Sequence, residues 1–164
     1  MKIKIFRIVM IVFVVLWMSA IFAFSAQDAT ESAALSGGLE YKLFSAFYPG
    51  FDQMTETEKQ QLLSDFPIRK MAHFTAYFAL GAFTFGAFVT YKKLFYKLRG
   101  LFSLFVCMLY SVSDEIHQYF VPGRSCEIRD MLIDTSGALL AILILALFCR
   151  FSKRIYPKIK SGEC

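Results

Sequence analysis

The sequence predicts an all-α integral membrane protein, a bundle of four transmembrane helices with both termini on the cytoplasmic side. Hydrophobic residues make up 57% and aromatic residues 17% of the 164-residue chain, well above the apolar share of soluble domains. Four apolar runs, residues 5–24, 68–90, 101–119 and 130–148, approach the roughly 20 residues that cross a hydrocarbon core of about 30 Å. Helices satisfy their own backbone hydrogen bonds in lipid, so we expect one membrane domain over residues 1–164.

The basic residues predict which side each end of the bundle faces. The net charge of +5 comes from lysines and arginines before the first span, between the second and third spans, and in the tail at 149–164. A chain that crosses four times brings all three clusters to one side, as the positive-inside rule requires of the cytoplasmic face. This distribution accounts for the positive charge without a nucleic-acid partner.

The first span also has the basic head and apolar body of a secretory signal, with a cleavage site conceivable at Ala23-Phe24-Ser25. Its apolar body is longer than the 7–15 residues typical of a signal. Removal of this segment would leave three spans and place one basic cluster on the wrong side of the membrane. We therefore expect the segment to stay in place as a transmembrane helix.

The outer loop, residues 25–67, is expected to form two short amphipathic helices. Leu39, Leu43 and Phe47 share one helical face before Pro49 breaks the chain, and Thr55-x-x-Glu58 resembles a capping box. The apolar faces are expected to rest on the bilayer surface or to cover the bundle. Packing against the bundle is the favoured interpretation, and a movable lid is the alternative.

Ionisable residues gather at the outer ends of the second, third and fourth spans, where they are costly in a membrane. On the second span, the stripe of His73, Tyr77 and Gly81 at four-residue spacing points into the bundle. The polar residues that end the third span cover about 160° of its circumference. Because the topology places the three ends at one depth, we predict a shared polar pocket. Its candidate residues are Lys70, His73, Tyr77, Asp114, Glu115, His117, Gln118, Arg124, Asp130 and Asp134.

Cysteine usage does not predict a disulfide framework. Cys107 lies within the third span, and Cys149 and Cys164 fall on the cytoplasmic side, so only Cys126 faces outward. We interpret all four as structural, with an intermolecular bridge through Cys126 as the exception left open.

The same residues resemble the motif set of the VanZ-like family of bacterial membrane proteins. The motifs are Phe24-Ser25-Ala26-Gln27, Lys70-x-x-His73-x-x-x-Tyr77, Asp114-Glu115-x-His117-Gln118-x-Phe120, Arg124 and Asp130-x-x-x-Asp134-x-x-Gly137. The resemblance extends from about Phe24 to Leu140. It implies a multi-pass protein of the bacterial cytoplasmic membrane, and its founding member is associated with resistance to the glycopeptide teicoplanin. It implies no defined biochemical activity.

Three roles for the polar pocket compete, and the sequence leaves open whether the chain is an enzyme. In the favoured one, Arg69, Lys70, Arg124 and Arg129 bind the phosphate of an anionic envelope lipid or cell-wall precursor. In the second, a divalent metal bound by residues among His73, Asp114, His117 and Asp130 supports an envelope lipid hydrolase or transferase, although the spacing matches no metal signature. In the third, ion pairs such as Lys70–Asp114 or Arg129–Asp130 only fix the helix ends. No cofactor is predicted, and no serine or cysteine has the context of a nucleophile.

Overall fold

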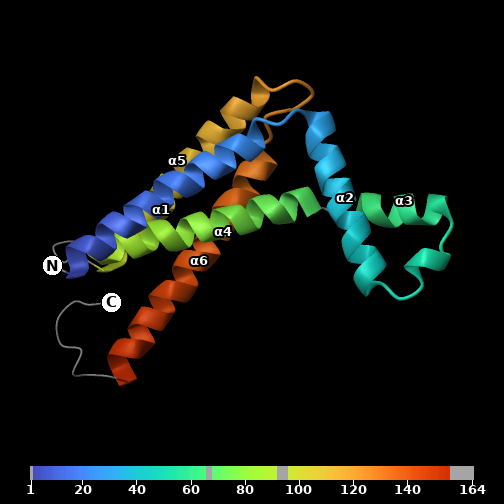
Figure 1. Ribbon diagram of the computed structural model, residues 1–164. Coiled ribbons are helices and arrows are strands. Elements are labelled where there is room, and N and C mark those ends of the chain that lie inside the picture. The colour runs from blue at the N-terminus through green and yellow to red at the C-terminus, as the bar shows by residue number, and fades with distance from the viewer. Residues whose placement is uncertain (1, 66–67, 92–95, 156–164) are drawn as a thin grey trace.

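The computed structural model describes residues 2–65, 68–91 and 96–155 (Figure 1). Its elements are α1 (Lys2–Ser25), α2 (Ala29–Phe47), the short 3-10 helix η1 (Phe51–Gln53), α3 (Glu56–Asp65), α4 (Ile68–Val89), α5 (Tyr96–Tyr119) and α6 (Ile128–Ile155). No strand occurs in these three segments, so the predicted all-α class is confirmed. Lys92, Lys93 and residues 156–164, on which part of the charge argument rests, lie outside the described residues.

Three stretches within the described chain are long and apolar enough to cross a membrane, namely Ile3–Ser25, Glu56–Val89 and Ile128–Phe151. The first lies in α1, the second covers α3 and α4, and the third lies in α6, so the chain is an integral membrane protein with multiple spans. The third predicted span corresponds to α5, a helix of 24 residues that is not among these stretches. Its length suffices, but its last turns carry Asp114, Glu115 and His117, which lower its mean hydropathy.

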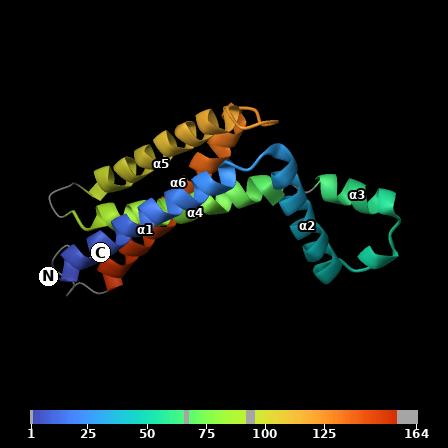
Figure 2. The same cartoon turned by 45° about the horizontal axis from the view of Figure 1, so that its top comes forward.

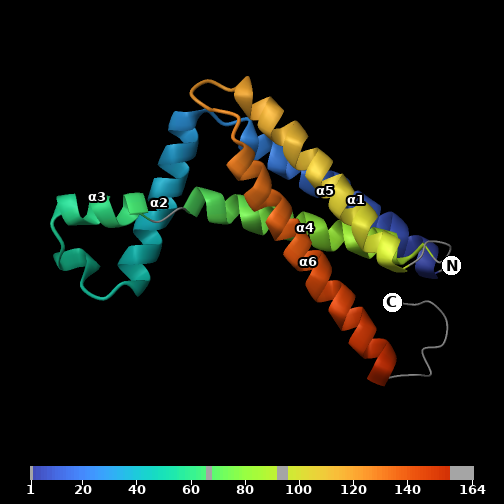
Figure 3. The same cartoon turned by 180° about the vertical axis from the view of Figure 1, so that it is seen from behind.

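Helix α4 lies at the centre of the bundle and packs against α1, α5 and α6 (Figure 2). Viewed from behind, α6 crosses α4 at a steep angle (Figure 3). Small residues make this crossing close: a Cβ atom on Gly81 would lie 2.6 Å from the carbonyl oxygen of Ala138, and one on Gly137 would collide with the backbone of Phe74. The face of α6 that carries Gly137 and Ala138 is thus the face that contacts α4, as small residues allow in membrane bundles.

Helix α1 is held to the bundle by two hydrogen bonds to backbone carbonyls. The Trp17 indole donates to the Ala76 oxygen at 2.8 Å, and the Tyr110 hydroxyl donates to the Met18 oxygen at 2.6 Å. These bonds tie α1 to both α4 and α5. The first predicted span is therefore an integral part of the helical core.

Contacts across the bundle show that successive long helices run in alternating directions. At one end, the Arg7 guanidinium binds Thr90, and Arg99 donates to the Val89 carbonyl. At the opposite end, Ser25 donates to Asp114 and His73 faces Asp134. We call the first the basic end and the second the polar end. The polar end is where the second, third and fourth predicted spans were expected to gather their ionisable residues.

The outer loop forms a helical arm beside the polar end, with α2 and α3 projecting from the bundle (Figure 1). The predicted capping box is confirmed: the Thr55 N–H donates to Glu58 Oε2 at 2.9 Å, and the Glu58 N–H donates to Thr55 Oγ1 at 3.4 Å. The apolar face of α2 is largely uncovered, since Phe47 is 81% exposed and Leu39 is 50% exposed. Only the first part of α2 closes over the bundle, where it forms one wall of a cavity.

Candidate functional site at the polar end

A chain of hydrogen bonds centred on Asp114 links α1, α5 and the turn that follows α5. The Asp114 side chain is buried, and its Oδ2 accepts from the Ser25 hydroxyl at 2.9 Å and from Gln118 Nε2 at 3.2 Å. Gln118 in turn accepts from Arg124 Nη1 at 3.0 Å. These bonds hold one oxygen of the carboxylate in place and leave Asp114 Oδ1 without a partner.

A second buried carboxylate, Asp134, links α4, α5 and α6. Its Oδ2 accepts from the Ser111 hydroxyl at 3.3 Å, and its Oδ1 lies 3.6 Å from His73 Nδ1. Asp134 is completely buried, because the close crossing of α4 and α6 covers it. His73, Asp114 and Asp134 thereby offer one nitrogen and two carboxylate oxygens within 4.8 Å of one another.

The other predicted residues surround this group. Lys70 Nζ lies 3.3 Å from Asp130 Oδ1, so Lys70 pairs with Asp130 and not with Asp114. Glu115 Oε2 accepts from the Glu127 N–H at 2.9 Å and anchors the loop before α6. The His117 ring stacks on Phe22, with the ring centroids 4.2 Å apart.

Seven buried side-chain atoms in the described residues have no hydrogen-bond partner, and all of them belong to the ten predicted pocket residues. They are Tyr77 OH, Asp114 Oδ1, Glu115 Oε1, His117 Nε2, Arg124 Nε, Asp130 Oδ1 and Asp134 Oδ1. Asp130 Oδ1 is close to Lys70 but not aligned for a hydrogen bond. Buried polar atoms are normally paired, so among the described residues the polar end is where buried polar groups remain unsatisfied.

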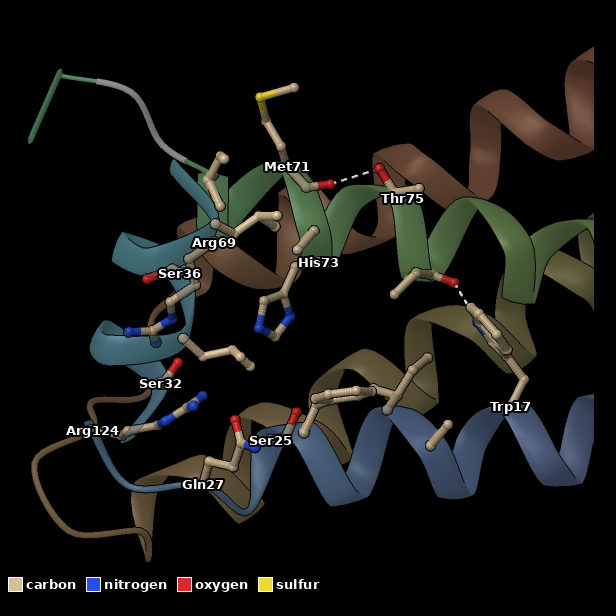
Figure 4. Close-up of a pocket in the computed structure, with 18 residues that line it drawn as sticks. Trp17, Ser25, Gln27, Ser32, Ser36, Arg69, Met71, His73, Thr75 and Arg124 are labelled. Carbon is tan, nitrogen blue, oxygen red and sulfur yellow. Dashed lines mark hydrogen bonds between the residues drawn. The ribbon is translucent and has the colours of Figure 1, made fainter. Parts of the chain in front are cut away.

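A cavity of about 550 Å³ lies between α1, α2 and α4, next to this polar cluster (Figure 4). Most of its wall is apolar, with Trp17 at one end, whereas Ser25, Ser32, Arg69 and Arg124 surround the end nearest α2. His73 points into the space between them (Figure 4). The cavity has the size of a small-molecule site and separates an apolar part from a cationic one.

The cavity opens at an apolar rim. Three of its lining residues are more than half exposed: Phe24 at 62%, Leu35 at 57% and Met71 at 51%. These exposed side chains make the entrance of the cavity apolar.

Comparison with known families identifies the chain. The sequence profile of the VanZ/LLP1 family matches residues 10–149, which is most of the chain. The chain belongs to the VanZ/LLP1 family. No curated protein and no solved structure matches it. The matched range includes all ten predicted pocket residues, so the polar cluster and the apolar cavity lie within the family domain.

In this VanZ/LLP1 fold, the two arginines of the cavity lie close enough to influence each other electrostatically. Burial, together with the neighbouring Arg69, lowers the pKa of Arg124, whereas the nearby carboxylates act in the opposite direction. The two guanidinium groups thus repel each other across the polar end of the cavity. An anion placed between them would relieve that repulsion.

Two residues that support the site were not predicted from the sequence. Ser25 and Ser111 each donate a hydrogen bond to a buried carboxylate. Ser25 stood in the Phe24–Gln27 motif at the end of the first span, and Ser111 precedes Asp114 by one helical turn. A search for hydroxyls one turn from each buried acid would have found Ser111, whereas Ser25 requires the packing of α1 against α5. Arg129, expected near phosphate, is exposed and does not line the cavity.

Proposed function

We propose that this VanZ/LLP1 protein binds a phosphate-bearing lipid at the outer face of the bacterial cytoplasmic membrane. The ligand class is an anionic envelope lipid or a lipid-linked cell-wall precursor. The observation that carries the proposal is the two-part cavity, which is apolar along most of its wall and has Arg69 and Arg124 at one end. An amphipathic ligand with a long apolar tail and a small anionic head matches this division.

The proposal includes a topology in which α5 is a fourth span and both termini are cytoplasmic. Helix α5 has 24 residues and packs against α1, α4 and α6, so it lies within the bundle with its polar turns covered by neighbours. Arg7 and Arg99 lie at the basic end, which by the positive-inside rule faces the cytoplasm. The polar end then lies just beneath the external boundary of the bilayer.

In this proposal, Arg69 and Arg124 bind the head group of the lipid. Arg124 Nη1 is held by Gln118, whereas Arg124 Nε is buried without a partner and remains available to an anion. Arg69 comes from the first turn of α4 and lines the same end of the cavity. Guanidinium groups bind phosphate through paired, charge-assisted hydrogen bonds, and such bonds are strong in a partly dry site.

The tail of the lipid would lie along the apolar wall between Trp17 and Leu39. Burial of this chain supplies affinity at about 0.8 kcal/mol for each buried CH2 group. A protein that holds such a lipid at the outer face can limit its contact with a glycopeptide that acts there. This is how the proposal connects to resistance against teicoplanin.

The direct test compares two ligands that differ only in the phosphate. The purified protein in lipid nanodiscs is titrated with a fluorescent polyprenyl phosphate and with the corresponding polyprenol. We expect the phosphate to bind at least about tenfold more tightly, since a buried charge-assisted pair contributes more than about 1.4 kcal/mol. Equal binding of the alcohol would contradict recognition of phosphate.

Matched arginine variants locate the site. Arg124→Gln and Arg69→Gln should each weaken binding of the polyprenyl phosphate about tenfold and leave binding of the polyprenol unchanged. Arg129→Gln is the control, because it removes the same charge from an exposed side chain outside the cavity. A loss in Arg129→Gln as large as that in Arg124→Gln would assign the effect to general surface charge.

A further inference from the structure

The group of His73, Asp114 and Asp134 lies directly behind the polar wall of the cavity and has the features of a built ligand set. The three residues come from α4, α5 and α6, and their ligand atoms lie within 4.8 Å of one another. Asp114 is 2% exposed and Asp134 is fully buried. In each carboxylate, Oδ1 has no hydrogen-bond partner.

The second oxygen of each carboxylate is fixed by donors from neighbouring helices. Ser25 and Gln118 hold Asp114 Oδ2, while Ser111 holds Asp134 Oδ2. Supporting hydrogen bonds of this kind orient the ligands of metal sites and leave the other oxygen free to coordinate. The same pattern at two independent acids distinguishes the group from a chance cluster of carboxylates.

The two buried carboxylates have few close cationic partners. Lys70 pairs with Asp130, and Arg124 acts on Asp114 electrostatically while its hydrogen bond goes to Gln118. Within the described residues, His73 is the basic group in the cluster itself, and even a protonated imidazole balances one carboxylate of two. Uncompensated carboxylates are costly to bury, which favours a bound cation here.

We propose that His73, Asp114 and Asp134 bind one divalent transition-metal ion, with Zn²⁺ and Mn²⁺ as the matching chemistries. An imidazole nitrogen and two carboxylate oxygens are ligands of both ions. Ligand atoms around tetrahedral Zn²⁺ lie about 3.3 Å apart. His73 Nδ1 and Asp134 Oδ1 are already 3.6 Å apart, so modest side-chain rotations complete the site.

Three protein ligands leave at least one coordination position open, as in metal sites that bind a further molecule. His73 and Ser25 both line the cavity, so the ion lies next to its polar end. A phosphate oxygen of a bound lipid can occupy the open position. This last step rests on the proposed lipid binding, whereas metal binding by the three residues does not depend on it.

The test uses the full chain, purified in detergent, stripped with a chelator and titrated with Zn²⁺ or Mn²⁺ alone, in the absence of added lipid. We expect one ion per chain by elemental analysis and calorimetry. Asp134→Asn and His73→Gln should each lower the affinity at least about tenfold. Glu127→Gln should keep wild-type affinity, since it removes a carboxylate from an exposed side chain just before α6, outside the ligand set.

A measurement on the wild type makes the test independent of whether the variants fold. X-ray absorption at the zinc edge should show a nitrogen and oxygen coordination shell without sulfur. Failure of the folded wild type to bind either ion, a sulfur ligand, or equal losses in Glu127→Gln and Asp134→Asn would overturn the proposal. Metal binding without a preference for polyprenyl phosphate would reject the proposed function alone, and the converse result would reject the metal site alone.

Discussion

The basic end and the polar end of the bundle differ in how completely their described polar side chains are hydrogen-bonded. At the basic end, Arg7 donates to Thr90 Oγ1 at 2.8 Å and to the Thr90 carbonyl at 2.9 Å, and its guanidinium lies 3.9 Å from the centre of the Tyr91 ring. Arg99 donates to the Val89 carbonyl at 3.1 Å. At the polar end, Asp114 and Asp134 each have one oxygen that accepts a hydrogen bond and one without a hydrogen-bond partner.

We interpret the basic end as an anchor that joins the helices and the polar end as the candidate site. Both ends are built from the same helices, so poor packing of the fold as a whole would leave unsatisfied atoms at both. In the described part of the chain, the buried side-chain atoms without a hydrogen-bond partner all occur at or near the polar end. Among the described residues, Arg7 and Arg99 at the basic end form bonds that join helices, whereas two buried carboxylates at the polar end each keep one oxygen without a hydrogen-bond partner. Functional sites commonly break the local rules that the rest of a fold obeys.

The largest effect is expected from Gly137→Leu, which disrupts the close crossing of α4 and α6 that assembles the polar end. A Cβ atom at this position would collide with the Phe74 carbonyl oxygen and lie 3.1 Å from its carbonyl carbon. Because backbone cannot yield as a side chain does, α4 and α6 must separate, at a cost of more than about 2 kcal/mol. We expect loss of membrane accumulation, measured by quantitative immunoblotting, and loss of thermal stability in detergent.

The neighbouring residue offers the control for this prediction. Ser136→Leu adds the same bulk at an exposed position of α6 and should accumulate normally. If Gly137→Leu accumulated as well as Ser136→Leu, the close crossing of α4 and α6 would be wrong. The meeting of His73 with Asp134 would then lose its structural basis.

A smaller and more selective effect is expected from Asp114→Asn. The amide oxygen can still accept from Ser25, and a neutral group costs less to bury than a carboxylate. We therefore expect the free energy of unfolding in detergent to stay within about 1 kcal/mol of the wild-type value or to rise. Any protection against teicoplanin that the wild-type chain confers on a susceptible host should be lost, as measured by growth at graded drug concentrations.

This variant separates the two interpretations of the polar end. A purely structural cluster predicts reduced accumulation of Asp114→Asn, with loss of protection in proportion. A functional cluster predicts normal accumulation without protection. Retention of full protection in a normally accumulating Asp114→Asn chain would contradict any role of this carboxylate in function.

Much of the polar end could be predicted from the sequence, because hydropathy and charge fix which helix ends meet. The stripe of His73, Tyr77 and Gly81 was expected to point into the bundle, and Tyr77 and Gly81 are buried there. Periodicity along a single helix was sufficient for this prediction.

Partners across helices could not be predicted in the same way. A Lys70–Asp114 ion pair was an example under one of the three competing roles, whereas in the structure Lys70 pairs with Asp130, because the rotation of α6 about its axis decides which of its side chains face α4. The apolar cavity was not expected at all. It depends on where α2 folds back over α1 and α4, and the helical face of α2 predicts only that it is amphipathic.

The smallest effect is expected at the basic end, from Arg7→Gln. This change removes the charge-assisted hydrogen bonds to Thr90 and the contact with the Tyr91 ring, at a cost of about 1–2 kcal/mol. Denaturant titration in detergent should show this loss, while Lys4→Gln, which removes the same charge from an exposed residue of α1, should not. Binding of Zn²⁺ and of polyprenyl phosphate should be unchanged, because the anchor acts only on stability. A change in either affinity would show that the two ends are coupled through the helices, and the separation of anchor from site would then fail.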